Sequence, residues 1–192
     1  MLKFHKSNFV TTLCLIIICF GCIPKEISIN HNELRIKSKN GVKIHQYKDQ
    51  AFSGIIYDKN TQEKLVKKYS VIEGLINGYH YTYYDNESVK EIVNYKDGVI
   101  FDLQFSFYKN GFYKEYTTYV NGKIHGVNIH FWPNNSEKAI HCYENGIKVG
   151  SSELFYPSGF LKSIGNFDNK GQKIGEWKNY DEKGKLIQVD FQ

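Results

Sequence analysis

One structural unit recurs along this chain at a step of 24 residues. Three glycines, Gly98, Gly122 and Gly146, are separated by this step, and so are the three tyrosines that stand three residues before them. A period between 20 and 50 residues is typical of repeat arrays, in which each unit buries its apolar surface mainly against its neighbours. The repeat therefore constrains the fold more than any other feature of the sequence.

Other positions keep the same step, with one extra residue in the last interval, just before Gly171. One column contains mostly glycine: Gly78, Asp102, Gly126, Gly150 and Gly175. Two adjacent columns are mostly aromatic: Tyr83, Phe107, Phe131, Phe155 and Tyr180, then Tyr84, Tyr108, Trp132, Tyr156 and Asp181. The pattern thus extends over most of the chain after residue 51.

Each unit has the sequence pattern of a β-hairpin. Leu103, Phe105 and Phe107 alternate with polar neighbours, and this period of two is typical of strands. Asn-Gly pairs such as Asn121-Gly122 favour tight hairpin turns because both residues tolerate positive φ. With two turns in 24 residues, the sequence predicts an all-β fold, an elongated antiparallel meander of about ten to twelve strands.

The segment Tyr119-Val120-Asn121-Gly122-Lys123-Ile124-His125-Gly126 and its equivalent one step later share the pattern Tyr-x-x-Gly-x-x-x-Gly. With the aromatic pairs that follow, and the ending from Gly171 to Asp181, the chain resembles the bacterial variant of MORN-repeat proteins over about residues 52–192. The resemblance implies hairpin arrays used for binding or scaffolding, without a common catalytic centre. Many relatives carry the label of a YwqK-type antitoxin.

The first 21 residues have the pattern of a secretory signal. Lys3 and Lys6 precede an apolar run of about 12 residues, which is short for a membrane span of about 20. Gly21-Cys22 matches the end of a bacterial lipobox, although Cys19 and Phe20 depart from its usual residues. We expect lipidation at Cys22 and attachment of the exported protein to a membrane of the bacterial cell envelope; an ordinary signal peptide or an uncleaved anchor is the alternative.

The sequence divides into three parts: a signal peptide over residues 1–21, a polar segment over 22–50, and the repeat domain over 51–192. We interpret the polar segment as a tether followed by a single strand that leads into the repeats. Once the signal is removed, Cys22 and Cys142 are the cysteines that remain. A disulfide framework is therefore not expected, and Cys142 is interpreted as a buried free thiol.

Charge argues against a nucleic-acid partner. The formal net charge is +5, falls by two without Lys3 and Lys6, and is spread among alternating lysines and acids, with Arg35 as the one arginine. Proteins that bind phosphate backbones usually have a denser basic surface.

No motif predicts an enzyme, a metal site or a cofactor. Of seven histidines, only His125, His130 and His141 are close in sequence, and none has the spacing of a zinc motif. With a turn near residues 134–135, His130 is expected to face about residue 139. The acidic residues Asp85, Glu87, Glu91, Asp97 and Asp102 are interpreted as turn residues, and an unbroken meander offers no evident cleft.

Aromatic side chains are the candidates for binding. Rings in exposed rows can stack on sugars or anchor a protein partner, although the same rows also cover a sheet. The candidates are Tyr84, Tyr108, Trp132, Tyr156 and Trp177, and the turn glycines expected to hold the frame are Gly98, Gly122, Gly146 and Gly171. The last strand, near residues 186–191, could also accept a strand from another chain or simply end the sheet.

These observations predict a non-catalytic, envelope-anchored repeat protein that binds or scaffolds a protein partner. Two alternatives stay open: an immunity or antitoxin-like protein that neutralises a toxin at the envelope, and a carbohydrate-binding module.

Overall fold

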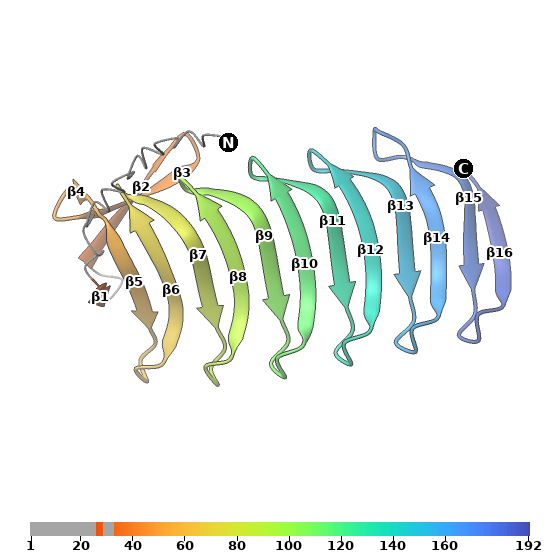
Figure 1. Ribbon diagram of the computed structural model, residues 1–192, viewed down its shortest axis with the longest axis horizontal. Coiled ribbons are helices and arrows are strands. Elements are labelled where there is room, and N and C mark those ends of the chain that lie inside the picture. Colours follow the sequence, from red (N-terminus) through yellow and green to blue (C-terminus); the bar gives the residue numbers. More distant parts are fainter. Residues whose placement is uncertain (1–25, 29–32) are drawn as a thin grey trace, which may run out of the picture.

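The computed structural model describes residues 26–28 and 33–192, which form two β-sheets (Figure 1). The larger sheet has 13 strands in the order β1-β5-β6 and then consecutively to β16. Their bounds are β1 (Glu26–Ser28), β5 (Gly54–Lys59), β6 (Leu65–Ile72), β7 (Leu75–Tyr83), β8 (Val89–Lys96), β9 (Val99–Phe107), β10 (Tyr113–Val120), β11 (Lys123–Phe131), β12 (Glu137–Glu144), β13 (Ile147–Phe155), β14 (Leu161–Phe167), β15 (Lys173–Tyr180) and β16 (Leu186–Phe191).

From β5 to β16 every strand pairs antiparallel with the next. Figure 1 shows them side by side as one curved layer that runs the length of the molecule. The predicted all-β meander of hairpins is confirmed.

The Asn-Gly turns hold successive hairpins together. Asn121 and Gly122 have φ of 51° and 75°, the left-handed pair that a two-residue type I′ hairpin requires. The Gly122 N–H donates to the Ile100 carbonyl of the preceding hairpin at 3.1 Å, and Gly98 and Gly146 donate to Ile76 and Ile124 in the same way, both at 2.8 Å. Gly171 differs, because the extra residue places it in a longer turn where its N–H bonds to the Asp168 carbonyl.

The glycine column marks a β-bulge in every second strand. Gly78, Asp102, Gly126, Gly150 and Gly175 all have positive φ, and the pairing register shifts beside each of them. At Gly126 the Thr118 hydroxyl takes the place of backbone hydrogen bonds that the bulge interrupts. It accepts from the Val127 N–H at 2.8 Å and donates to the His125 carbonyl at 2.5 Å. Each of these bulges shifts the pairing register within its own hairpin.

The polar segment differs from the predicted tether and single strand. Three strands, β2 (Leu34–Lys39), β3 (Val42–Tyr47) and β4 (Gln50–Ala51), form a small separate sheet, and β1 pairs in parallel with β5. Asn40-Gly41 makes another turn with both φ positive, so what we interpreted as one strand folds back as a hairpin.

The hydrophobic core lies where the two sheets meet. Phe52, Ile56, Tyr69 and Val71 are buried together, and His45 of β3 packs its ring against Tyr69 at 5.6 Å. Backbone bonds fix the contact, since the His45 N–H donates to the Gly74 carbonyl at 2.8 Å. The small sheet therefore covers one face of the large sheet at its β5–β7 end.

The large sheet has two chemically different faces, because side chains alternate along each strand. The face that we call the polar face carries Glu91, Gln104, Thr117 and Asn128, and at the β5–β7 end it lies under the small sheet. The face that we call the aromatic face carries a cluster of rings 5.2–5.9 Å apart, formed by Phe105, Phe107, Tyr113, Tyr116 and Phe131. In the part of the chain that the structure describes, no helix is long and apolar enough to cross a membrane.

Candidate functional site

Four of the predicted binding aromatics connect adjacent hairpins. They lie just after the strands, and each uses its polar tip to donate to a backbone carbonyl of the next hairpin. The pairs are Tyr84 with Phe107 at 2.7 Å, Tyr108 with Phe131 at 2.8 Å, Trp132 with Phe155 at 3.1 Å, and Tyr156 with Tyr180 at 2.9 Å. These four residues thus recur at the repeat step because each one joins its hairpin to the next.

Lysines lie over most of these rings. The ammonium of Lys138 is 4.6 Å from the centre of the Trp132 ring, and that of Lys162 is 5.4 Å from the Tyr156 ring. Tyr84 has two such neighbours, Lys90 at 5.9 Å and Lys109 at 5.7 Å. A sugar that stacked on one of these faces would have to displace a cation–π contact.

Trp177 does not present an open ring. Its side chain is 7% exposed and packs edge-on against Phe167 at 5.2 Å. The space for the indole exists because Gly165, on the neighbouring strand, has no side chain. Trp177, one of the candidate binding aromatics, therefore lies in the interior of the polar face and not in an exposed row.

A row of polar residues crosses the middle of the sheet instead. Glu91 of β8 pairs with Ser106 of β9, Ser106 pairs with Glu115 of β10, and Glu115 pairs with His130 of β11. Directly paired residues share a face, and strands are about 4.8 Å apart, so the backbones of Glu91 and Glu115 lie about 10 Å from each other on either side of Ser106. Glu91 is thus a mid-strand residue, whereas we had interpreted it as a turn residue.

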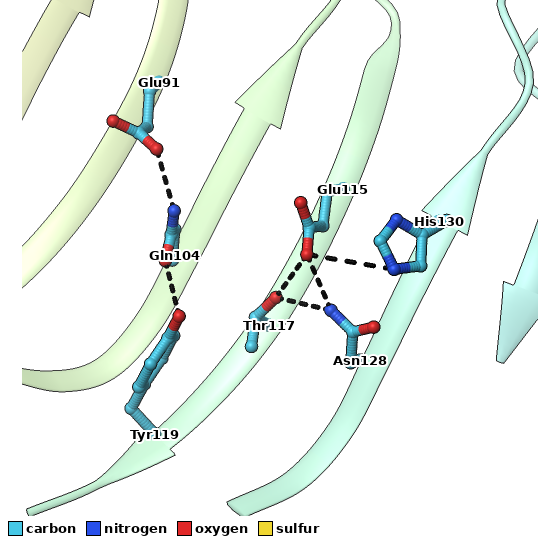
Figure 2. A network of polar contacts seen from close by, with 7 residues as sticks. All are labelled: Glu91, Gln104, Glu115, Thr117, Tyr119, Asn128 and His130. Carbon is cyan, nitrogen blue, oxygen red and sulfur yellow. Dashed lines mark hydrogen bonds and ion pairs between the residues drawn. The ribbon is translucent and has the colours of Figure 1, made fainter. Parts of the chain in front are cut away.

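Hydrogen bonds hold these side chains in place (Figure 2). Gln104 donates to Glu91 Oε1 at 2.7 Å and accepts from the Tyr119 hydroxyl at 2.7 Å. Glu115 Oε1 accepts from Asn128 Nδ2 at 2.8 Å and from the Thr117 hydroxyl at 3.2 Å. In Figure 2 the second oxygen of each carboxylate points away from these partners.

The row opens into a pocket of about 410 Å³ on the polar face. Ser106 Oγ is buried there without a hydrogen-bond partner among the described residues, although a buried hydroxyl normally has one. The pocket is lined by Val66, Lys67, Thr82, Tyr83, Tyr84, Lys90, Glu91, Ser106, Phe107, Lys114 and Glu115. The meander therefore does form a hollow, contrary to our expectation.

The phenols beside the pocket remain hydrogen-bond donors. Burial, followed by the charges of Glu115 and Glu91, raises the pKa of Tyr119, and burial with Glu91 does the same for the pKa of Tyr95. Both phenols stay protonated at neutral pH. The lining of the pocket itself combines the carboxylates of Glu91 and Glu115 with three lysines, Lys67, Lys90 and Lys114, so it offers both acceptors and donors to a polar ligand.

The histidines lie where the register predicts. His130 pairs with Ala139, as expected from the turn, and its ring is 6.3 Å from that of His141. His141 in turn contacts the Ser152 hydroxyl at 2.9 Å. Across residues 26–28 and 33–192, no group of three or more His, Cys, Asp or Glu side chains is placed to hold a metal ion.

Two cysteines, Cys142 and Cys22, were also singled out in the sequence. Cys142 is a free thiol that is half-buried, not buried as expected. Cys22, the predicted lipidation residue, lies outside the described residues.

The pocket residues were missed in the sequence because they do not repeat. Glu91 and Glu115 are 24 residues apart, but the next equivalents are Ala139 and Ser163. Only the cross-strand register brings Ser106 between the two carboxylates.

A scan of the chain against protein-family models found no matching family, and a search of curated proteins found no match. The geometry of the polar face is therefore the basis on which a function is argued.

Proposed function

We propose that this protein is a non-catalytic binding module, anchored at the cell envelope through Cys22, that holds a protein partner on its polar face. The observation that carries the proposal is the pocket of about 410 Å³ on the polar face, in which Glu91 and Glu115 lie on either side of Ser106.

The chemistry of the pocket favours a protein partner. Backbone N–H groups and Lys or Arg side chains are good donors to the two carboxylates, and backbone carbonyls or acidic side chains are good acceptors for Lys67, Lys90 and Lys114 in the same pocket. The nearby rings of Tyr84, Trp132 and Tyr156 already have lysines over them, which disfavours sugar stacking. The long polar face also offers a partner more area than a single pocket does.

The 24-residue hairpins and their Asn-Gly turns support a distant relationship to bacterial MORN-repeat proteins. That relationship is part of the proposal, and it fits a binding or scaffolding role. If the partner is a toxin, the protein would act as an immunity protein.

Affinity capture from envelope extract tests the binding surface. The full wild-type chain should retain a partner that the Glu91→Lys, Glu115→Lys double variant loses. The matched control is Glu137→Lys, Glu144→Lys, which makes the same charge change at two exposed positions of β12. Equal capture by the pocket variant and the control, or no specific capture by the wild type, would overturn the proposal.

Two further measurements test the remaining parts. A glycan array probed with the same proteins would support the carbohydrate alternative if glycans bind in a way that Trp132→Ala and Tyr156→Ala abolish. Metabolic labelling with a palmitate analogue tests the anchor: label should appear on the wild type and be absent from Cys22→Ala.

A further inference from the structure

The outer edge of β16 differs from the other end of the large sheet. At the first end β1 covers β5, whereas among the described residues no strand pairs with the outer edge of β16. The side chains there are unusually apolar for an open edge: Ile187 is 62% exposed and Phe191 is 74% exposed. Open edges normally carry charges or proline that prevent pairing with another chain.

The backbone of this edge is positioned to accept a strand. Gln192 exchanges both of its backbone bonds with Gly175 of β15, at 3.1 Å each. Antiparallel pairs alternate between bonded and non-bonded, and the register continues from Phe191 opposite Glu176 to Val189 opposite Lys178. The N–H and C=O groups of Val189 and Phe191 therefore point away from β15, toward solvent.

We propose that two copies of this chain pair antiparallel through β16, with the twofold axis at Val189. An axis there lets Val189 exchange two backbone bonds with its own copy. It also places Phe191 opposite Ile187 of the second copy and Gln188 opposite Asp190. Apolar groups then meet apolar groups, and the Gln188–Asp190 hydrogen bond that each chain makes at 2.8 Å lies beside its copy without a like-charge contact.

The neighbouring registers are less complementary. An axis at Gln188 sets Phe191 against Lys185 and Asp190 against Leu186. An axis at Asp190 brings the two Asp190 carboxylates together, which is repulsive. In the Val189 register, Gln188 and Asp190 of both copies also lie on the polar face, because Asp190 pairs with Trp177. Each face thus continues from one copy to the other.

Sedimentation velocity on the full chain in detergent tests the association. The wild type should shift from monomer to dimer between about 1 and about 100 μM. Val189→Lys places two ammonium groups on the axis and should raise the dissociation constant at least about tenfold, with an unchanged thermal midpoint at about 1 μM, where the wild type is also monomeric. Val120→Lys, at a valine that is 46% exposed at the end of β10, is the control and should dimerise normally.

Cross-linking tests the register separately. In a chain whose four native cysteines are serine, Val189→Cys should form a disulfide-linked dimer, since bonded antiparallel pairs have Cα atoms about 5.5 Å apart. Gln188→Cys should cross-link far more slowly, because it faces Asp190. A wild type that stays monomeric, or cross-linking at residue 188 as fast as at 189, would overturn the proposal.

Discussion

Gly165 provides the sharpest test of how the polar face is packed. A Cβ at this position would stand 2.2 Å from Cδ2 and 2.3 Å from Cε2 of Trp177. Ordinary carbon contacts lie at about 3.5–4.0 Å, so in Gly165→Ala the indole must retreat by about 1 Å or more. It has little room to do so, because Phe167 packs on one side and Lys173 lies 4.2 Å above the ring.

The expected magnitude follows from two opposing effects. Overpacking of this kind costs about 1–3 kcal/mol, whereas replacing glycine by alanine stabilises by about 0.4–1 kcal/mol through the unfolded chain. The net loss should be about 1–2 kcal/mol, which corresponds to a thermal midpoint about 2–8 °C lower in a domain of this size. Circular dichroism during thermal and urea unfolding measures it.

A double-mutant cycle isolates the cause. In a Trp177→Leu background, Gly165→Ala should be neutral or stabilising, because the clashing ring is gone. The reasoning is refuted if Gly165→Ala is as stable as the wild type, or if its cost is undiminished when Trp177 is absent.

Three other predictions concern single positions. Asp102→Gly should stabilise by about 0.5–1 kcal/mol, since Asp102 has φ of 67° in a column otherwise occupied by glycine; urea unfolding measures this. Tyr108→Phe should cost about 1 kcal/mol by removing the bond to the Phe131 carbonyl, seen as a lower urea midpoint. Burial, then Lys148 and His130, lowers the pKa of His141 from 6.5 to about 4. The neutral ring therefore stabilises the folded protein fully above about pH 6.5, and this stabilisation is lost as the pH falls toward 4. In His141→Gln the drop in the unfolding midpoint between pH 7 and pH 4.5 should be smaller than in the wild type.

The meander could be predicted because its signals are local and recur. An Asn-Gly pair such as Asn121-Gly122 strongly favours a two-residue hairpin turn. Four repeats of the pattern then predict consecutive hairpins in one meander. The small sheet was missed although Asn40-Gly41 carries the same signal, because residues 22–50 fall outside the 24-residue columns. Without the repeat, this single Asn-Gly pair was not enough to predict a hairpin there.

The pocket could not be predicted because the bulges were not recognised. The Asp97-Gly98 turn sets Tyr95 against Ile100, and a regular ladder from there would place Glu91 opposite Gln104. The bulge at Asp102 shifts the register, so Glu91 pairs with Ser106 instead. The glycine column was visible in the sequence, but a column of glycines does not reveal how many residues the partner strand skips.

The difference between repeating and non-repeating positions separates the residues that build the sheet from those that line the proposed binding face. Residues that join units keep an aromatic ring with a polar tip, as Tyr84, Tyr108, Trp132 and Tyr156 do, because each donates to a backbone carbonyl of the next hairpin. The central pairs of the polar face change from unit to unit: Val93 with Gln104, Thr117 with Asn128, His141 with Ser152, and Gly165 beside Trp177. A repeat frame tolerates such change where a side chain does not take part in the contacts that join successive units. The polar face can therefore acquire a specific pocket, as between Glu91 and Glu115, while the turns and bulges that build the sheet stay the same.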